Sequence, residues 1–252
     1  MLVLMSEAST LIPRARLHDQ VVRQLALLVI GSPTDGSLPN EIELMRRFGV
    51  SRTVVREAVK VLASKGLIAV RPKTGMRVRP RHDWNLLDPD LVSWQYEAGP
   101  DESFFAELSE VRMIVETSAA ELAAVRAADH EISAIFGWLR QMEQTVEDNE
   151  AFIAADLQFH HAILEACHNN LLRQMSGTVG IALRESRLIT TQIPGSSRAS
   201  LPLHAAVADA IRDHDAASAR AAMEHLLRDA ADGIKRVLHS QQTTIPAAAE
   251  EQ

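Results

Sequence analysis

Residues 38–67 read LPNEIELMRRFGVSRTVVREAVKVLASKGL, and this stretch decides the fold of the first part of the chain. Its apolar residues recur at helical spacing, which predicts a short helix over 40–47, a turn over 48–50 and a second helix after the turn. Gly49 supplies the backbone freedom that a tight turn needs. Ser51 belongs to the residue types that cap helix N-termini, so we expect the second helix to begin there.

The second helix has two chemically different faces. Four apolar residues share one face, at the spacing of a helix that packs against a core: Val55, Ala58, Val59 and Leu62. The opposite face groups polar and basic residues: Arg52, Thr53, Arg56 and Lys60. One face is therefore expected to pack inside the domain, while the other can contact a nucleic-acid duplex.

A short basic stretch follows this helix. Residues 68–80 read IAVRPKTGMRVRP and alternate apolar with basic residues around a Pro-Lys-Thr-Gly turn, which predicts a small two-stranded wing. The basic residues that would line a phosphate-facing edge of this wing are Arg71, Lys73, Arg77 and Arg79. Any one of these arginines alone is more often a solvated surface charge. The combination of turn, helix cap, basic helix face and basic wing indicates DNA binding.

The same residues carry a family resemblance. Residues 38–68 resemble the winged helix-turn-helix of the GntR family of bacterial transcription regulators, and VSRTVVREAV is a specific match. In that family the start of the recognition helix reads the major groove and the wing tip enters the minor groove. The resemblance implies double-stranded DNA as partner and these contact residues: Ser51, Arg52, Thr53, Arg56, Lys60, Lys73 and Gly75. One departure is Ile42, which stands where the family usually has an arginine.

Charge is distributed unevenly along the 252 residues, although the whole chain has a formal net charge of −7. Residues 1–82 contain 14 Lys/Arg and 6 Asp/Glu, a balance of +8. The remainder contains 12 Lys/Arg and 27 Asp/Glu, a balance of −15. A basic first part joined to an acidic second part indicates a nucleic-acid module attached to a different kind of domain.

The composition, with 46% hydrophobic and 4% aromatic residues, favours a helical protein that buries a sizeable core. No run of 18 or more apolar residues occurs and the first ten residues lack the basic region of a secretory signal, so we expect a cytoplasmic protein with no membrane partner. The single cysteine, Cys167, excludes an internal disulfide framework and multi-cysteine zinc motifs.

Helical spacing dominates after the wing. Six helical stretches are expected, over 102–127, 129–147, 150–167, 169–191, 200–213 and 216–239. They predict an antiparallel all-α bundle. The predicted protein is thus mostly α and has five parts: a tail over 1–13, a winged helix-turn-helix domain with a small β wing over 14–80, a hinge with a short helix over 81–100, an all-helical ligand-binding and dimerisation domain over 101–240, and a disordered tail over 241–252.

Three polar residues of this second part lie on apolar helix faces. In DLQFHHAIL, residues 156–164, Asp156 and His160 fall inside the arc of apolar residues, whereas His161 faces the polar side. His204 also shares its side of a helix with apolar residues. Burying such groups without a partner costs several kcal/mol, so something must satisfy them. A lone core histidine is usually just hydrogen-bonded, but three such residues favour a metal or ligand site.

Four segments of the second part resemble the all-helical ligand-binding domain, the FCD domain, of the FadR branch of the GntR family: residues 107–124, 156–164, 167–172 and 203–227. In much of that branch an aspartate and three histidines hold a divalent metal beside a carboxylate effector. Asp156, His160 and His204 match the first three ligands, and zinc, nickel or manganese is the implied metal.

The fourth histidine of the family pattern has no direct counterpart. The matching position is Leu226, and His225 is adjacent but rotated by about 100°. Three alternatives stay open: a shifted helix register with His225 as ligand, a site with three protein ligands and room for water or effector, and no metal at all.

Three residues are candidates for binding the effector. Arg112 lies where the family often places an effector-binding arginine, and a guanidinium suits a carboxylate; a surface pair with Glu116 is the equally weighted alternative. Arg184 is a weaker candidate, together with Arg187. Asn170 either donates to the ligand or, as we favour, caps the following helix. Within the branch the chain looks most like regulators of sugar-acid catabolism such as galactonate-operon repressors, which implies an aldonic acid or a related hydroxy-carboxylate.

The leading hypothesis is a homodimeric, ligand-responsive transcription factor, most simply a repressor, that binds a roughly palindromic operator. A second hypothesis is a metalloenzyme fused to a DNA-binding module, but no general base stands beside the site on the same helix face. A third is a regulator in which Asp156, His160 and His204 form a structural polar cluster without metal.

Overall fold

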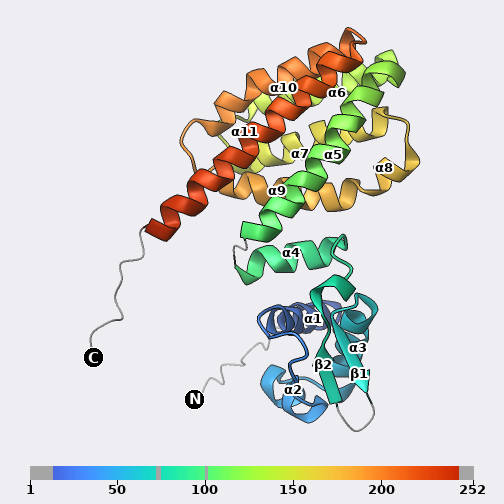
Figure 1. Cartoon of the computed structure of the whole chain (residues 1–252), viewed down its shortest axis with the longest axis vertical. Helices are drawn as coiled ribbons and strands as arrows, with labels where there is room; N and C mark the ends of the chain where they lie inside the picture. The colour runs from blue at the N-terminus through green and yellow to red at the C-terminus, as the bar shows by residue number, and fades with distance from the viewer. Residues whose placement is uncertain (1–13, 72–74, 100–101, 244–252) are drawn as a thin grey trace, which may run out of the picture. The chain divides into compact units, whose positions relative to one another are not determined.

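The computed structural model describes residues 14–71, 75–99 and 102–243. The chain divides into two compact units, Met1–Gly99 and Pro100–Gln252. Helices make up most of both units, and the described residues contain one small sheet (Figure 1). Within the described part of the chain, no helix is long and apolar enough to cross a membrane.

The first unit has the predicted winged helix-turn-helix elements. In chain order these are α1 (Arg14–Ile30), α2 (Glu41–Phe48), α3 (Arg52–Ser64), β1 (Ile68–Arg71), β2 (Gly75–Val78), the 3-10 turn η1 (Arg81–Asp83) and α4 (Pro89–Ala98). The two strands are antiparallel, with Ile68 opposite Val78. The expectation of helices followed by a small β wing is confirmed.

Local chemistry explains the turn between α2 and α3. Asn40 caps α2 by accepting hydrogen bonds from the Ile42 and Glu43 amides, and the Glu43 carboxylate accepts from the Asn40 amide in return. Gly49 ends the helix in the left-handed conformation, with φ of 66°, which glycine adopts without strain. α3 then begins after Ser51.

The segment expected as a hinge contributes to the core of the first unit. α4 packs against α1, and it buries Leu91 completely and Trp94 almost completely. Lys65 at the end of α3 forms an ion pair with Asp88, which caps α4. The residue after Lys65 must be a glycine. Gly66 has φ of +81°, and a Cβ atom at this position would lie 2.3 Å from the Asp83 carbonyl oxygen.

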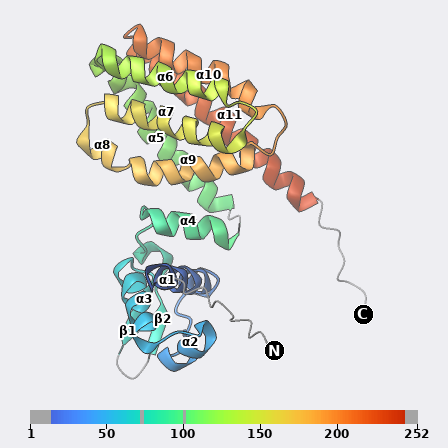
Figure 2. The same cartoon turned by 180° about the vertical axis from the view of Figure 1, so that it is seen from behind.

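The second unit is a helical bundle, as expected. Its helices are α5 (Glu102–Arg126), α6 (Asp129–Gln144), α7 (Asn149–Ala166), α8 (Asn170–Gln174), α9 (Ser176–Thr190), α10 (Ser196–Arg212) and α11 (Ala216–Thr243). α5 packs against α11 and α7, and α10 packs against α11 and α6. α7 lies between α6 and α9 in the view from behind (Figure 2). The bundle thereby surrounds α7, which carries two of the candidate site residues.

The helix boundaries differ from the sequence expectation in several places. α6 ends at Gln144 instead of 147, and α11 continues to Thr243, through the first residues of the segment expected as a disordered tail. The stretch 169–191 forms two helices that meet at Met175, where the poor helix formers Ser176 and Gly177 follow. α10 begins at Ser196 instead of at 200, so Pro202 lies in the second turn of the helix instead of the first. Burial of the first turns of α10, at Ser197 and Ser200, accompanies the longer helix.

The bundle core consists mainly of aliphatic residues with two phenylalanines, Phe152 and Phe159, on α7. Cys167 is fully buried at the end of α7, and its thiol donates to the Leu164 carbonyl oxygen. Burial raises the pKa of this thiol. The Asp, Glu, Arg and His side chains buried in this core among the described residues form one cluster.

Candidate functional site

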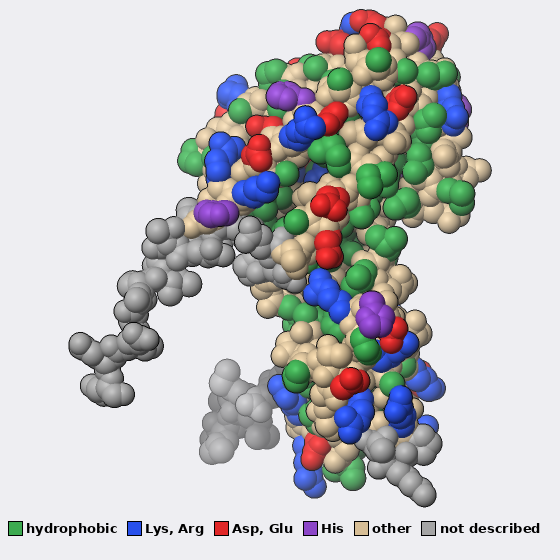
Figure 3. Space-filling view, viewed as in Figure 1, with side chains coloured by type: hydrophobic (Ala, Val, Ile, Leu, Met, Phe, Trp, Pro, Cys, Tyr) green, Lys and Arg blue, Asp and Glu red, His purple; other side chains and the backbone are tan. Residues whose placement is uncertain are grey.

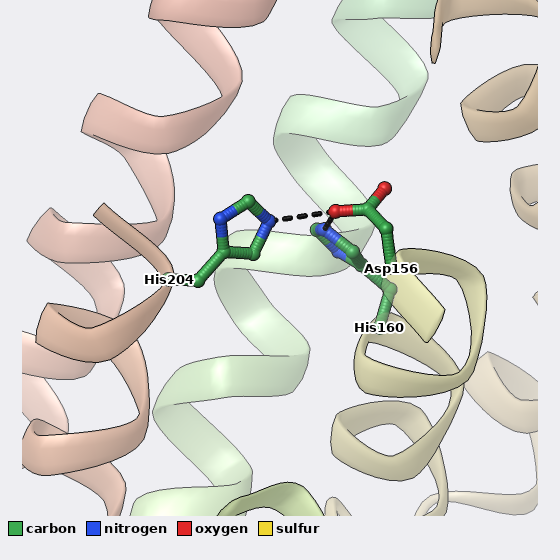
Figure 4. Close-up of side chains that lie close together, drawn as sticks. All are labelled: Asp156, His160 and His204. Atoms are coloured by element: carbon green, nitrogen blue, oxygen red, sulfur yellow. Dashed lines mark ion pairs between the residues drawn. The ribbon is translucent and has the colours of Figure 1, made fainter. Parts of the chain in front are cut away.

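Asp156, His160 and His204 come together in the bundle core. Asp156 and His160 lie one helical turn apart on α7, and His204 approaches them from α10 (Figure 4). Each offers one ligand atom, and these atoms lie within 4.8 Å of one another. Asp156 and His204 are fully buried and His160 is 3% exposed. The structure therefore brings together the three residues that the sequence singled out as metal ligands.

The Nδ1 nitrogen of each imidazole, which faces away from Asp156, lies beside an oxygen atom. The His204 Nδ1 atom lies 2.8 Å from the Ser200 carbonyl oxygen, to which it donates. The His160 Nδ1 atom contacts the Glu116 carboxylate. Partners of this kind orient histidine ligands in metal sites, because they leave the Nε2 lone pair facing inward.

The inner nitrogens face Asp156. His204 Nε2 is 2.8 Å and His160 Nε2 is 3.9 Å from Asp156 Oδ1. His160 Nε2 has no hydrogen-bond partner among the described residues although it is buried. Two imidazole nitrogens and a carboxylate that converge in this way fit a divalent cation such as zinc.

A cationic side chain from α9 also enters the cluster. Arg187 Nε donates to Asp156 Oδ2 at 2.8 Å, and Arg187 Nη2 donates to Asp156 Oδ1 at 2.9 Å. The same Nη2 atom lies 3.2 Å from His204 Nε2. Arg187 is 6% exposed, so its guanidinium compensates the buried negative charge of Asp156 at close range.

A second buried ion pair extends the cluster toward α5. Arg112 Nε donates to Glu116 Oε1 at 2.7 Å, and Arg112 Nη1 lies 3.4 Å from the Ser186 hydroxyl on α9. Arg112 and Glu116 are 5% and 1% exposed. The pair considered in the sequence is thus formed, but it lies in the interior instead of at the surface, because α5 turns both residues toward α7.

The electrostatics keep both carboxylates ionised. Burial alone would raise the pKa of Glu116, but the Arg112 charge and then His160 lower it to about 2. Burial opposes ionisation of Asp156 as well, yet Arg187 and His204 hold the pKa of that carboxyl well below its usual range. Burial lowers the pKa of His204, which favours the neutral imidazole that a metal ligand requires.

The remaining sequence candidates lie outside this cluster. Arg184 is exposed, pairs with Glu185 and lines a cavity of about 420 Å³ that His160 also lines. Asn170 is exposed, and the residue that caps α8 is Asn169, so the assignment of the cap to Asn170 was wrong by one residue. His225 is exposed while Leu226 is buried, because α11 turns Leu226 toward the core.

The candidate DNA-contacting residues of α3 are all at the surface. Ser51 occupies the N-cap position but makes no capping hydrogen bond through its side chain. The other exposed candidates on this helix are Arg52, Thr53, Arg56 and Lys60. Glu41 of α2 accepts a hydrogen bond from Arg52 at 2.8 Å and lies 3.9 Å from Arg56, so it forms exposed ion pairs with both arginines.

The wing is described on both sides of its tip. Gly75 begins β2 with φ of 77° and is exposed, whereas Lys73 lies outside the described residues. Ile42, the departure from the family pattern, is 57% exposed on α2. In the space-filling view, basic side chains gather on the part of the first unit that carries α2 and the wing, while the bundle surface mixes both signs of charge (Figure 3).

Sequence reasoning missed the partners within the cluster. Glu116 entered only as a surface partner of Arg112, and Arg187 only as a weaker anion-binding candidate. A signal for Arg187 was present, because it recurs at helical spacing with Val179 and Leu183 on the buried face of α9. No local signal links Glu116 to His160, since the two lie on different helices.

A winged helix-turn-helix unit followed by an all-helical unit with a buried polar cluster defines a two-domain transcription regulator. Residues 19–78 match the bacterial regulatory proteins of the gntR family, and residues 107–229 match the FCD domain. The chain belongs to the GntR family of transcriptional regulators. The families matched are those of regulators, which sets aside the enzyme alternative.

Named relatives agree with this membership. The chain is 32% identical over 225 residues to the galactonate operon transcriptional repressor of Escherichia coli strain K12, covering 87% of this chain and 97% of that protein. It is 34% identical over 223 residues to a protein of the same strain named for regulation of the L-lactate dehydrogenase operon, covering 84% and 83%. The fold resembles the solved structure of Lar, described as controlling the Listeria monocytogenes agr system, with a TM-score of 0.64, 16% identity and coverage of 92% and 99%.

Proposed function

We propose that this chain is a homodimeric repressor that binds a palindromic operator and responds to a carboxylate effector bound beside a divalent metal in the helical unit. The observation that carries the proposal is the buried cluster of Asp156, His160 and His204 in a chain with a GntR helix-turn-helix. A buried polar cluster of this kind needs a structural or ligand-binding reason, because its desolvation is costly.

DNA contact is assigned to the exposed face of α3 and to the wing. Arg52 and Arg56 reach base edges or phosphates, with Ser51, Thr53 and Lys60 beside them and Lys73 and Gly75 at the wing. The partly exposed Glu41 carboxylate pairs with Arg52, and DNA must displace or share this contact on binding. Two copies of this unit in a dimer match a two-fold symmetric operator.

The metal is assigned to Asp156, His160 and His204, with zinc first and nickel or manganese as alternatives. When bound, the metal supplies a positive charge that attracts the carboxylate of an effector. Arg112, Arg184 and Asn170 remain the proposed effector contacts, with Arg112 the only buried one. The names of the relatives, which refer to galactonate and L-lactate, support a hydroxy-carboxylate as effector.

The DNA-binding part is tested with Arg52→Ala. An operator selected from a random duplex pool with the native protein should bind the variant about 5- to 150-fold more weakly, since a good bidentate base contact contributes roughly 1–3 kcal/mol. Fluorescence anisotropy at fixed salt measures the affinity. The matched control is Arg228→Ala, which removes an exposed, paired arginine from α11 and should keep native affinity. Equal affinity of the Arg52 variant would reject the recognition-helix assignment.

The effector part is tested by thermal melting with and without D-galactonate, before and after chelator treatment. A ligand that binds only the folded state raises the melting temperature. We expect galactonate to raise it and chelation to abolish the rise. If chelation lowers the melting temperature but galactonate does not change it, the metal assignment is supported and the effector assignment is contradicted. Indifference to both treatments would contradict the ligand-binding proposal as a whole.

A further inference from the structure

We propose that Arg187 is a built-in cation that occupies the cation position of the Asp156 cluster and must leave it when a divalent metal binds. This inference rests on the proposed metal site and describes how that site is regulated. It starts from the single atom Arg187 Nη2, which lies 2.9 Å from Asp156 Oδ1 and 3.2 Å from His204 Nε2. These are two of the three ligand atoms that a metal would use.

Shared ligand atoms support the inference. A zinc ion lies about 2.0–2.2 Å from histidine nitrogen and carboxylate oxygen ligands. Asp156 Oδ1 and His204 Nε2 are 2.8 Å apart, and Arg187 Nη2 lies 2.9 Å from the first and 3.2 Å from the second, so an ion bound to both atoms would have to share them with the guanidinium. Guanidinium and metal therefore compete for the same lone pairs.

Charge balance supports it independently. Asp156 pairs with Arg187, and Glu116 pairs with Arg112, so the buried cluster with neutral histidines carries no net charge. Adding a divalent cation while Arg187 stays in place would leave two uncompensated positive charges in the core. Uncompensated buried charge is strongly destabilising. Departure of Arg187 from Asp156 removes one of these charges and frees the carboxylate for the metal.

The histidines are already arranged for this exchange. His160 and His204 both direct their outer nitrogens to fixed acceptors, the Glu116 carboxylate and the Ser200 carbonyl oxygen. His160 Nε2 has no hydrogen-bond partner within the described part of the chain. Arg187 thus satisfies two of the three ligands and leaves the third unsatisfied, whereas a metal ion would satisfy all three.

The test is a Zn²⁺ titration of the chelator-treated full-length protein by calorimetry. If Arg187 occupies the site most of the time, the apparent affinity of the native protein is reduced by the fraction of molecules with an open site. Arg187→Gln should therefore bind Zn²⁺ about tenfold or more tightly than the native protein. The same variant should melt at a lower temperature than the native protein without Zn²⁺, because Asp156 loses its cation, and Zn²⁺ should reduce this difference.

Arg198→Gln is the matched control. It removes an arginine from α10, the helix that carries His204, but this arginine is exposed and pairs with Glu147. We expect native Zn²⁺ affinity for it. If Arg187→Gln does not fold, Arg187→Lys keeps a charge but loses the bidentate contact, and it should bind Zn²⁺ more tightly than the native protein.

Unchanged or weaker Zn²⁺ binding by the folded Arg187 variant would overturn the inference, since a residue that merely supports the metal ligands weakens binding when it is removed. Absence of Zn²⁺ binding in both native protein and variant would also overturn it. Binding by the variant alone would support complete occupation by Arg187. Operator binding measured on the same samples separates these outcomes from failure of the proposed DNA-binding function.

Discussion

Glu116 links two buried basic groups, Arg112 on its own helix and His160 on α7. Its pKa is about 2 in the folded protein, against 4.5 for an ordinary glutamate. A carboxylate whose pKa is depressed by folding stabilises the folded state above its ordinary pKa. This contribution is therefore present above pH 4.5 and is lost as the pH falls toward about 2. The full difference between the two pKa values corresponds to roughly 3 kcal/mol in the free energy of unfolding.

We expect the free energy of unfolding, measured by denaturant titration, to decrease between pH 5 and pH 3. Neutral His204 acts in the same direction, because its pKa in the folded protein lies below 6.5 and acidification favours the unfolded state. Glu116→Gln should lower stability at pH 7 and flatten its dependence on pH below 4.5. Glu121→Gln, on the same helix but in a surface pair with Arg220, should leave that dependence unchanged. An unaltered pH profile in the Glu116 variant would contradict this account.

The sequence allowed prediction of the buried cluster but not of its partners. Asp156, His160 and His204 could be found because a polar residue on an apolar helix face is visible in the periodicity of one helix. Their contacts with Glu116 and Arg187 arise from packing between helices, which periodicity alone does not encode. The same periodicity indicates that Arg187 lies on a buried helix face. It does not indicate that Arg187 pairs with Asp156.

At the scale of elements, the N-terminal caps of α2 and α3 differ in their hydrogen bonding, although Asn40 and Ser51 are both residue types that commonly cap helices. Asn40 makes capping hydrogen bonds and Ser51 makes none through its side chain. Asn40→Ala should therefore cost about 1 kcal/mol in the free energy of unfolding. Ser51→Ala should change it by less than about 0.5 kcal/mol and should instead weaken operator binding. Equal losses of stability in the two variants would show that Ser51 also acts as a cap.

Helix existence was easier to predict than helix ends. Apolar periodicity located every long helix of the second unit, because burial of one face is a property that each helix carries in its own residues. The break at Met175 and the early start of α10 at Ser196 were not predicted. The break coincides with the poor helix formers Ser176 and Gly177, whereas Pro202 shows that a helix can contain a residue that the local rule excludes.

At the scale of the molecule, each unit has its own apolar core. We therefore expect two unfolding transitions in calorimetry of the full chain. Gly66→Ala should lower the transition of the first unit by about 5 °C or more, since it combines left-handed backbone strain with a close contact to Asp83, and it should leave the other transition in place. Gly49→Ala, with a similar φ but open space around it, should shift the same transition less. A single transition that moves as a whole would contradict independent unfolding.

The charge pattern predicted two modules but placed their boundary early. The sign of the charge changes near residue 82, whereas the compact units divide after Gly99. The segment between these positions carries acidic residues and no Lys or Arg, so by charge it belongs with the second part. Leu91 and Trp94 nevertheless pack into the first core, because apolar burial and not charge determines which unit a helix joins.

Burial of Cys167 has a practical consequence for spectroscopy. The chain has one cysteine, and its thiol is fully buried, hydrogen-bonded and, because burial raises its pKa, mostly uncharged at neutral pH. Maleimide and nitroxide reagents require an accessible thiolate. A cysteine introduced at an exposed position would thus carry the label selectively in the natural background. Distances between labels on the two subunits of the proposed dimer, with and without galactonate, can then be measured without first removing a native thiol.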